Sequence, residues 1–400
     1  MKWRGSMVWR TTDAVLLIAL LAAGCGESHT PVAGSVRDSA GIRIVEYGNW
    51  PATPAPIVVE PQPIFAFGWK ASDHPFEDIV AGDILPDGRV AVADGGSTLQ
   101  VVVLSREGTV EAVLGGPGDG PGEFRRISAV THLDSSSVVV DDPRSGRLSL
   151  FRSGYFTRTV ELSDARYMRA LGTDSQASVL LGPPLAIVYG RRYPTPWLAV
   201  PLIKLDLTAQ SFDTVGFADW DRGSGNPFAS WGFVAANEMG FVVGRSDTPD
   251  LRWLDLNGHL RQIVRWKAAR VEVSDSLWSD WEESFRAFAA RRPQIYSARD
   301  VEESIASTHA QVTEPLPLFG SLMVDPEGEV WIGAYPTRLS SHARTPTRFD
   351  VLTPGGEWLG TVSLPPRSRF RLLAVGTDRL MGVARDSLDI QAVVVYRLTR

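Results

Sequence analysis

The feature that most constrains this chain is a β pattern that repeats loosely from about residue 42 to the C-terminus. Short apolar runs alternate with turns rich in Gly, Asp, Pro and Ser. In the clearest copy, residues 84–114, the pairs Asp87-Gly88 and Glu107-Gly108 separate runs rich in valine and leucine. An Asp-Gly pair between such runs is a strong hairpin signal. Further copies begin near residues 127, 167, 233, 319 and 370.

A repeat of roughly 40 residues with about four strands per copy is typical of propeller blades. Each small sheet has two apolar faces that it cannot bury alone, and stacking the sheets in a ring buries both. The pattern therefore predicts an all-β fold, a six-bladed β-propeller over residues 42–400. An open pair of β-sandwiches is the alternative, but it does not explain the repeat. We expect residues 42–47 to close the ring by completing the last blade.

One segment, about residues 274–310, departs from the β pattern. Its apolar residues recur at the spacing of one helical face: Leu277, Trp281, Phe285 and Phe288. Ser279 with Glu282, and Ser297 with Asp300, fit helix-capping boxes. The segment predicts a small α-helical insertion between blades four and five. We expect its apolar stripe to pack on the ring, and a lid over the central funnel or a partner-docking element is the alternative.

The first 25 residues have the pattern of an export signal. Lys2, Arg4 and Arg10 precede an apolar run at residues 14–23, and Gly24-Cys25 follows. Ten apolar residues are too few to cross a bilayer, so the run indicates a signal peptide. Cys25 is the only cysteine and cannot form an internal disulfide.

Residues 21–25, Leu-Ala-Ala-Gly-Cys, resemble the lipobox of bacterial lipoproteins, although Ala22 stands where that family usually has leucine. The resemblance implies lipidation at Cys25, which would become the mature N-terminus, and anchoring of an exported protein to the cell envelope. An ordinary secretory signal cut nearby is the alternative. Residues 26–41 are small, polar and proline-containing, so they predict a flexible tether between membrane and domain.

Residues 115–124, Gly-Gly-Pro-Gly-Asp-Gly-Pro-Gly-Glu-Phe, resemble the G-x-G-x-GPGEF signature of bacterial six-bladed propellers related to NHL-repeat proteins. Residues 147–151 and 325–332 are also similar to blade elements of that family. The resemblance covers residues 42–400 and is poorest near residues 183–197. It implies a propeller with a scaffold or binding role and no single shared reaction.

The composition of the same loop predicts a blade-to-blade crossover. Its glycines and prolines exclude a helix or a central strand. We expect Glu123 to accept hydrogen bonds from exposed backbone amides there. A phosphate-binding loop is the alternative, but the lysine and the following helix of a P-loop are missing.

Candidate metal ligands are carboxylates at strand ends, where inner strands of a propeller meet its funnel: Asp83, Asp94, Asp141, Asp142 and Asp325. Propeller lactonases, which the fold resembles, hold calcium at such positions with oxygen ligands. The simpler interpretation, which we favour, is that these carboxylates accept hydrogen bonds from turn amides. Asp94, Asp141, Asp142 and Asp325 are therefore metal ligands only under the alternative in which Ca²⁺ occupies the funnel.

Candidate ligand-binding residues lie in a polar loop that contains Asp219, Trp220 and Arg222, and at Trp278 in the helical segment. Exposed aromatic side chains bind sugars and peptides, but blade cores also use tryptophan. The net charge of −6 disfavours a nucleic-acid partner, because phosphate binding requires a basic face.

The sequence contains none of the common catalytic or metal-binding motifs, such as H-E-x-x-H, C-x-x-C or G-x-S-x-G. We therefore expect a membrane-tethered, extracytoplasmic binding or scaffold propeller rather than an enzyme, with a protein, peptide or glycan partner. The alternative is a calcium-dependent propeller hydrolase or lyase, similar to lactonases, with its metal in the central funnel. A purely structural envelope protein is a third hypothesis.

Overall fold

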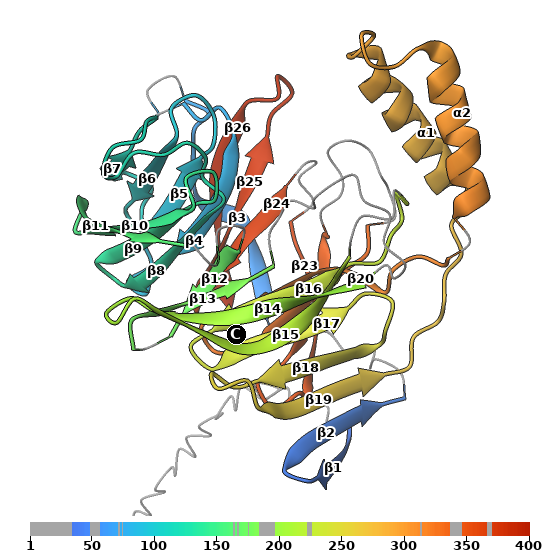
Figure 1. The fold of residues 1–400 in the computed structure, drawn as a ribbon, viewed down its shortest axis with the longest axis horizontal. Coiled ribbons are helices and arrows are strands. Elements are labelled where there is room, and N and C mark those ends of the chain that lie inside the picture. The colour runs from blue at the N-terminus through green and yellow to red at the C-terminus, as the bar shows by residue number, and fades with distance from the viewer. Residues whose placement is uncertain are drawn as a thin grey trace, which may run out of the picture.

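The computed structural model describes residues 34–48, 57–70, 73, 75–162, 165, 168–174, 176–183, 197–221, 226–312, 314–336, 346–365 and 370–400. These residues form six separate β-sheets of four or more strands (Figure 1). This arrangement confirms the all-β, six-bladed propeller predicted from the repeat.

Within each blade the strands follow the chain from the ring axis outward. The first three blades contain β4 (Ile79–Ile84), β5 (Val90–Asp94), β6 (Gln100–Leu104) and β7 (Val110–Gly115); β8 (Ala129–Asp134), β9 (Ser137–Asp142), β10 (Arg147–Arg152) and β11 (Tyr155–Glu161); and β12 (Arg169–Thr173), β13 (Ser178–Gly182), β14 (Trp197–Asp206) and β15 (Ser211–Asp221).

The next blades repeat this order. They contain β16 (Gly232–Asn237), β17 (Gly240–Arg245), β18 (Asp250–Leu254) and β19 (Leu260–Trp266); β20 (Phe319–Val324), β21 (Val330–Ala334), β22 (Arg348–Leu352) and β23 (Trp358–Ser363); and β24 (Arg371–Val375), β25 (Arg379–Arg385) and β26 (Gln391–Thr399), which pairs with β3 (Val58–Phe67).

Hydrophobic clusters between neighbouring blades hold the ring together. Six buried clusters each combine residues of two adjacent blades. In one of them Val139 of β9 packs with Val179 of β13, and in another Trp331 of β21 packs with Tyr396 of β26. All four side chains are fully buried. Each blade therefore buries both of its faces against its neighbours, as the ring hypothesis requires.

The strand that closes the ring is not the predicted one. β3 pairs antiparallel with β26 and completes the last blade. β2 (Ile42–Tyr47) instead pairs parallel with β19, and β1 (Ser35–Ser39) forms the outer edge of that sheet. Pro61 and Pro63 interrupt the alternating pattern of β3 and conceal it in the sequence. Prolines are tolerated there because an outermost strand has unpaired N–H positions. β1 also falls within residues 26–41, where the sequence predicted a flexible tether.

The loop at residues 115–124 connects β7 to β8 and has the predicted crossover role. Gly115 has φ +79, and a Cβ there would lie 2.1 Å from the ring of buried Phe124. Glu123 Oε2 accepts a hydrogen bond from Gly120 N at 2.7 Å, as expected from the sequence. Arg147 Nη2 donates to the carbonyls of Gly120 and Glu123 at 3.1 and 2.7 Å. The loop is thus fixed by backbone shape and by one arginine of the following blade.

Two helices, α1 (Asp275–Ala290) and α2 (Ala298–Gln311), lie in the chain between β19 and β20 and lean away from the ring as an arm (Figure 1). Their apolar stripe packs on the ring only at its base, where Leu277 forms a cluster with Phe228 and Leu316. Trp281 and Phe285 of α1 pack against Val301 and Ile305 of α2, because each helix supplies the apolar face that buries the other. No helix in the described part of the chain has the length and apolarity to span a membrane.

The helix caps differ in how well the sequence predicted them. Ser297 and Asp300 form the capping box at the start of α2, as predicted. α1 begins one turn earlier than expected, because Ser274 rather than Ser279 is its N-cap. Ser274 accepts from Leu277 N, and Ser279 instead donates to Asp275 O within the helix.

Candidate functional site

The six innermost strands line a central channel that contains two cavities of about 300 Å³ each. The first, the crossover chamber, lies at the starts of these strands and is lined by Arg169 and Arg371. The second, the hairpin chamber, lies at their ends and is lined by His132, Asp174 and Asp325. The chambers meet at a ring with one residue from each inner strand: Asp83, Thr131, Leu171, Ala236, Val324 and Val375.

Two arginines give the crossover chamber its charge. Arg169 is the first residue of β12 and Arg371 is the first residue of β24. These strands belong to blades three steps apart in a ring of six, so the two side chains enter the chamber from opposite walls. Most of the remaining wall is made of Val, Ala and Leu residues. The chamber is therefore cationic, and most of the other side chains around it are uncharged.

Arg169 has little to balance its charge. Its Nε is buried without a hydrogen-bond partner, and the guanidinium forms no ion pair with a carboxylate of the described residues. Burial lowers the pKa of Arg169, the carboxyl of Asp141 opposes this effect, and the like charge of Arg371 adds to it. An arginine stays charged under these conditions, so the site carries a desolvated positive charge.

Arg371 is held by one backbone contact. Its Nη2 donates to Ile79 O in the adjacent blade at 2.6 Å. Burial lowers the pKa of Arg371, which Asp78 opposes and the like charge of Arg385 reinforces. The fold therefore holds two guanidinium groups that repel each other in one chamber. Such an arrangement favours an anion between them.

Asp141 is the carboxylate whose charge acts on Arg169, and it lies near the end of β9. Its Oδ2 accepts from Ser128 Oγ at 2.8 Å and from Ala170 N at 3.3 Å, whereas its Oδ1 is buried without a partner. Burial raises the pKa of Asp141 to about 6, and the two hydrogen bonds and Arg169 only partly oppose this shift. The charge that balances Arg169 thus depends on pH.

The hairpin chamber contains a His-Asp pair that joins neighbouring blades. Asp83 Oδ2 accepts from both His132 N at 2.9 Å and His132 Nδ1 at 2.8 Å. Burial lowers the pKa of His132, but the charge and hydrogen bond of Asp83, together with the charges of Asp134 and Asp87, outweigh this effect and raise the pKa above its usual value of 6.5. Thr173 Oγ1 also donates to His132 O at 2.8 Å. These bonds connect three inner strands that share no β-sheet pairing.

Two other acids of the hairpin chamber, Asp174 and Asp325, are also partnered, whereas Glu238 forms no ion pair with a described residue. Asp174 forms an ion pair with Lys204 at 2.9 Å. Asp325 pairs with Arg400 and accepts from Trp331 Nε1 at 3.2 Å and from Glu329 N at 2.9 Å. Burial raises the pKa of Asp325, and Arg400 opposes this shift. The end of the channel opposite the arginines therefore consists largely of satisfied ion pairs.

Two of the predicted metal ligands stabilise blade crossovers. Asp94 Oδ1 accepts from Asp78 N at 2.9 Å, and Asp142 Oδ2 accepts from Arg125 N at 2.9 Å. In both cases the carboxylate ends the second strand of a blade and binds the segment that enters the first strand. This repeated contact matches the interpretation as turn-amide acceptors that the sequence favoured.

The four predicted metal ligands do not form one cluster. The carboxylates of Asp94, Asp142 and Asp325 accept hydrogen bonds from backbone or side-chain donors. The carboxylate of Asp141 interacts with the charge of Arg169. Among the described residues, no group of three or more His, Cys, Asp or Glu side chains could hold a metal ion. Calcium requires six to eight oxygen ligands, whereas the crossover chamber presents two guanidinium groups and the hairpin chamber pairs Asp83, Asp174 and Asp325 with basic side chains. The described residues therefore do not fit a funnel Ca²⁺.

The predicted binding loop is partly a strand, since Asp219 and Trp220 lie in β15. Asp219 lies 3.5 Å from Arg245, and half-buried Trp220 packs against a core cluster. Trp278 stacks on His309 at 3.8 Å between ring centroids and contacts Phe228 and Trp281 edge-on at the base of the arm. Arg222 and Cys25 lie outside the described residues. The roles assigned to Asp219, Trp220, Arg222 and Cys25 stay predictions.

Sequence reasoning missed Arg169, Arg371 and His132. Each lies within or at the start of a short apolar strand, where a charged or titratable residue departs from the pattern of its neighbours. That departure is the one signal in the sequence that could have identified them. Arg169 and Arg371 are 202 positions apart, so their convergence follows only from the ring.

Comparisons with known proteins show the fold alone. No protein-family model matches this chain, and no curated protein matches it. The crystal structure of a DUF4221-family member from Bacteroides vulgatus is 12% identical, with a TM-score of 0.52 over 87% of this chain and 100% of that one. A protein described as exported, from Bacteroides fragilis, is 8% identical, with a TM-score of 0.52 over 89% and 99%. This chain therefore shares the fold of these two proteins.

Proposed function

We propose that this chain is an exported, lipid-anchored binding protein of the bacterial cell envelope, related to NHL-repeat propellers. Its ligand is a small anion held in the central channel between Arg169 and Arg371. The export signal and the lipobox at residues 21–25 support the location. The propeller fold supports a binding role, because function on this fold depends on the site rather than on the architecture.

The observation that carries the ligand class is the pair of buried, like-charged guanidinium groups in the crossover chamber. Burying a charge is costly unless it is paired, and two like charges in one chamber increase that cost. A bound carboxylate, phosphate or sulfate group would offset both effects through charge-assisted hydrogen bonds. The chamber volume of about 300 Å³ is at the small end of ligand pockets, which indicates a small molecule.

The alternative of a calcium-dependent hydrolase or lyase has less support. It requires several oxygen ligands around one point of the funnel, and the acids Asp83, Asp174 and Asp325 that line the hairpin chamber each pair with a basic side chain instead. No arrangement in the described part of the chain favours that reaction over binding.

Sulfate binding tests the channel, because sulfate keeps a constant charge across the accessible pH range. Calorimetric titration of the chain from Gly26 to Arg400 with sulfate is expected to show binding. Arg169→Gln or Arg371→Gln is expected to weaken it by roughly tenfold to a hundredfold, the effect of losing one charge-assisted contact. Arg252→Gln is the matched control, since Arg252 is exposed on β18 and pairs with Asp250. No binding to the parent chain, or equal loss in the control, contradicts the proposal.

Fractionation of cells that produce the full chain tests the anchor. We expect the protein in the membrane fraction and an acylated N-terminal peptide that begins at Cys25 in mass spectra. Cys25→Ser is expected to abolish acylation and to shift the protein to the soluble fraction or leave it unprocessed. An unacylated mature chain whose signal is cut elsewhere contradicts the lipoprotein assignment.

A further inference from the structure

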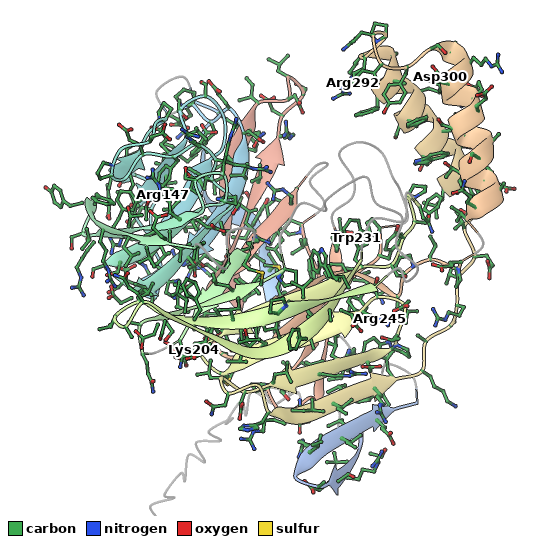
Figure 2. All side chains as sticks on the ribbon, in the orientation of Figure 1. Arg147, Lys204, Trp231, Arg245, Arg292 and Asp300 are labelled. Atoms are coloured by element: carbon green, nitrogen blue, oxygen red, sulfur yellow. The ribbon has the colours of Figure 1, made fainter. Side chains whose placement is uncertain are left out.

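The arm formed by α1 and α2 ends in a tip at residues 287–299, which joins the two helices. Figure 2 shows Arg292 and Asp300 at the end of the arm farthest from the ring. The apolar stripe of the arm is used internally, because Trp281 and Phe285 pack against α2. The tip is therefore the part of the arm where apolar side chains are not covered by the other helix.

Large apolar side chains are exposed at this tip. Phe288 is 42% exposed and Ile295 is 62% exposed. Tyr296 packs edge-on against Phe288 with ring centroids 6.0 Å apart, and exposed Ile295 directly precedes Tyr296 in the chain. Isolated exposed apolar residues are common on proteins, but an aromatic and an aliphatic side chain at the end of a projecting arm indicate a contact surface.

The tip is also basic, although the chain as a whole has a net charge of −6. Residues 287–299 include Arg291, Arg292 and Arg299, and the one acid beside them, Asp300, accepts a hydrogen bond from Ser297 N in the capping box of α2. Arg292 lies over the ring of Phe288, with its Cζ 3.9 Å from the centroid. Neither Arg291 nor Arg292 forms an ion pair with a described carboxylate, whereas Arg299 pairs with Glu303 at 2.6 Å.

The shaft of the arm has the opposite character. Glu282 and Glu302 both pair with Arg286, at 3.0 and 2.9 Å. Glu282 also binds His309 at 2.9 Å. Acidic side chains thus lie along the helices, and unpaired positive charge lies at the tip. This separation of charge favours an anionic partner that meets the arm end-on.

The predicted lipid anchor leaves the propeller at the same end of the same blade as the arm. Ser35, near the start of β1, lies beside Glu46 of β2, which lies beside Arg265 of β19. The chain leaves β19 for the arm directly after Trp266. Eight residues lie between Cys25 and Gly34, so an extended chain can span about 30 Å from one to the other, and the 16 residues of α1 extend about 24 Å. Tether and arm can therefore reach the same surface.

We propose that the arm tip docks on the surface of an anionic lipid bilayer. Arg291 and Arg292 bind lipid phosphates, and Phe288 and Ile295 enter the interfacial region. Basic residues are attracted to the surface of an anionic membrane, and apolar groups that enter the interfacial region strengthen the binding. With one acylated residue holding the chain, a second contact of this kind fixes the orientation of the ring relative to the membrane. This orientation rests on the anchor proposed above, whereas the lipid contact itself does not.

Vesicle sedimentation with the unacylated chain from Gly26 to Arg400 tests the contact. This chain keeps every described residue and lacks the apolar export segment. We expect at least threefold more protein bound to phosphatidylcholine vesicles that contain about a third phosphatidylglycerol than to phosphatidylcholine alone, and less binding at high salt. Arg291→Gln with Arg292→Gln is expected to abolish the preference. Phe288→Ser with Ile295→Ser is expected to lower binding at least threefold.

Arg252→Gln with Arg261→Gln is the matched control, since it removes the same number of exposed arginines from the ring. Thermal unfolding of each variant shows whether the propeller is intact. Equal binding to both vesicle types, or unchanged binding by both tip variants, overturns the proposal. A tip that serves a protein partner also gives no vesicle binding. Because the tested chain has no lipid, these outcomes are independent of acylation at Cys25.

Discussion

The two chambers of the channel are built by the same six strands but treat charge in opposite ways. In the hairpin chamber, Asp83, Asp174 and Asp325 each have a basic partner within hydrogen-bonding distance. In the crossover chamber, Arg169 and Arg371 have no carboxylate partner among the described residues. One end of the channel is thus satisfied by the protein itself, and the other end is not.

This difference separates the paired acids, which stabilise the ring, from the two arginines, which we propose bind a ligand. The inner strands of adjacent blades share no sheet, so side-chain bonds such as Asp83 to His132 join them. Asp94 and Asp142 each bind the crossover segment that leads into the first strand of their own blade. Arg371 makes one such bond, to Ile79 O, and Arg169 makes none with a described residue. Changes in the two chambers should therefore affect different measurements.

The largest expected effect is on stability, from Asp325→Ala. This change removes the acceptor for Trp331 Nε1 and Glu329 N and leaves the guanidinium of Arg400 without its closest partner. We expect the free energy of unfolding to fall by about 2–4 kcal/mol, as measured by denaturant unfolding near pH 7. Sulfate affinity is expected to stay within twofold of the parent. A weakened sulfate site in a folded variant would show that the chambers are not independent.

The next effect is on binding and its pH dependence, from Asp141→Asn. As pH falls through about 6, Asp141 takes up a proton and no longer neutralises Arg169. Sulfate affinity of the parent should therefore rise on acidification, by roughly threefold to tenfold. The groups that face Asp141 are Arg169, Asp142, Ser128 and the amide of Ala170.

Asparagine at position 141 is neutral at every pH, so this variant should bind sulfate at pH 8 as tightly as the parent does near pH 5. Calorimetric titrations at both pH values measure the difference. A variant that keeps the pH dependence of the parent assigns that dependence to another group. Loss of binding at both pH values would show instead that Asp141 holds Arg169 in position.

The ring itself was predictable because its physics is local. The Asp87-Gly88 turn and the short apolar runs define one blade, and the repeat defines the others. The closing strand was not predictable, because Pro61 and Pro63 break the pattern of β3, whereas residues 42–47 alternate well. The pairing of β3 with β26 and of β2 with β19, which are distant in the sequence, determines which strand closes the ring. The arm was predicted as two helices, but their mutual packing depends on an angle that the sequence does not contain.

The site was less predictable than the fold. Strand-end carboxylates such as Asp94 and Asp142 are conspicuous in the sequence, and whether they bind amides or a metal depends on which segment passes in front of them. Arg169 and Arg371 are inconspicuous, because each is one basic residue at the edge of an apolar run. Their significance arises from being desolvated together. Convergence of distant strands, rather than local pattern, makes this channel a candidate site.

The smallest expected effect concerns the His132–Asp83 pair, which contributes to stability in one pH range. The folded pKa of His132 is raised above 6.5, so its contribution is complete below the unfolded pKa and is lost as pH rises through the folded pKa. His132→Gln should therefore lower the free energy of unfolding by about 1 kcal/mol near pH 5.5 and by less near pH 9, where the neutral imidazole keeps only a hydrogen bond. Denaturant unfolding at both pH values measures the loss.

A double-mutant cycle isolates this pair from other titrating groups. The single variant His132→Gln also removes the interactions of His132 with the charges of Asp134 and Asp87, so its effect is not that of the pair alone. Comparing His132→Gln, Asp83→Asn and the double variant isolates the coupling between His132 and Asp83. The coupling energy should be favourable near pH 5.5 and should shrink near pH 9. A coupling that does not change with pH would mean that the pair acts as a neutral hydrogen bond, and the hairpin chamber would then hold one negative charge that its histidine does not balance.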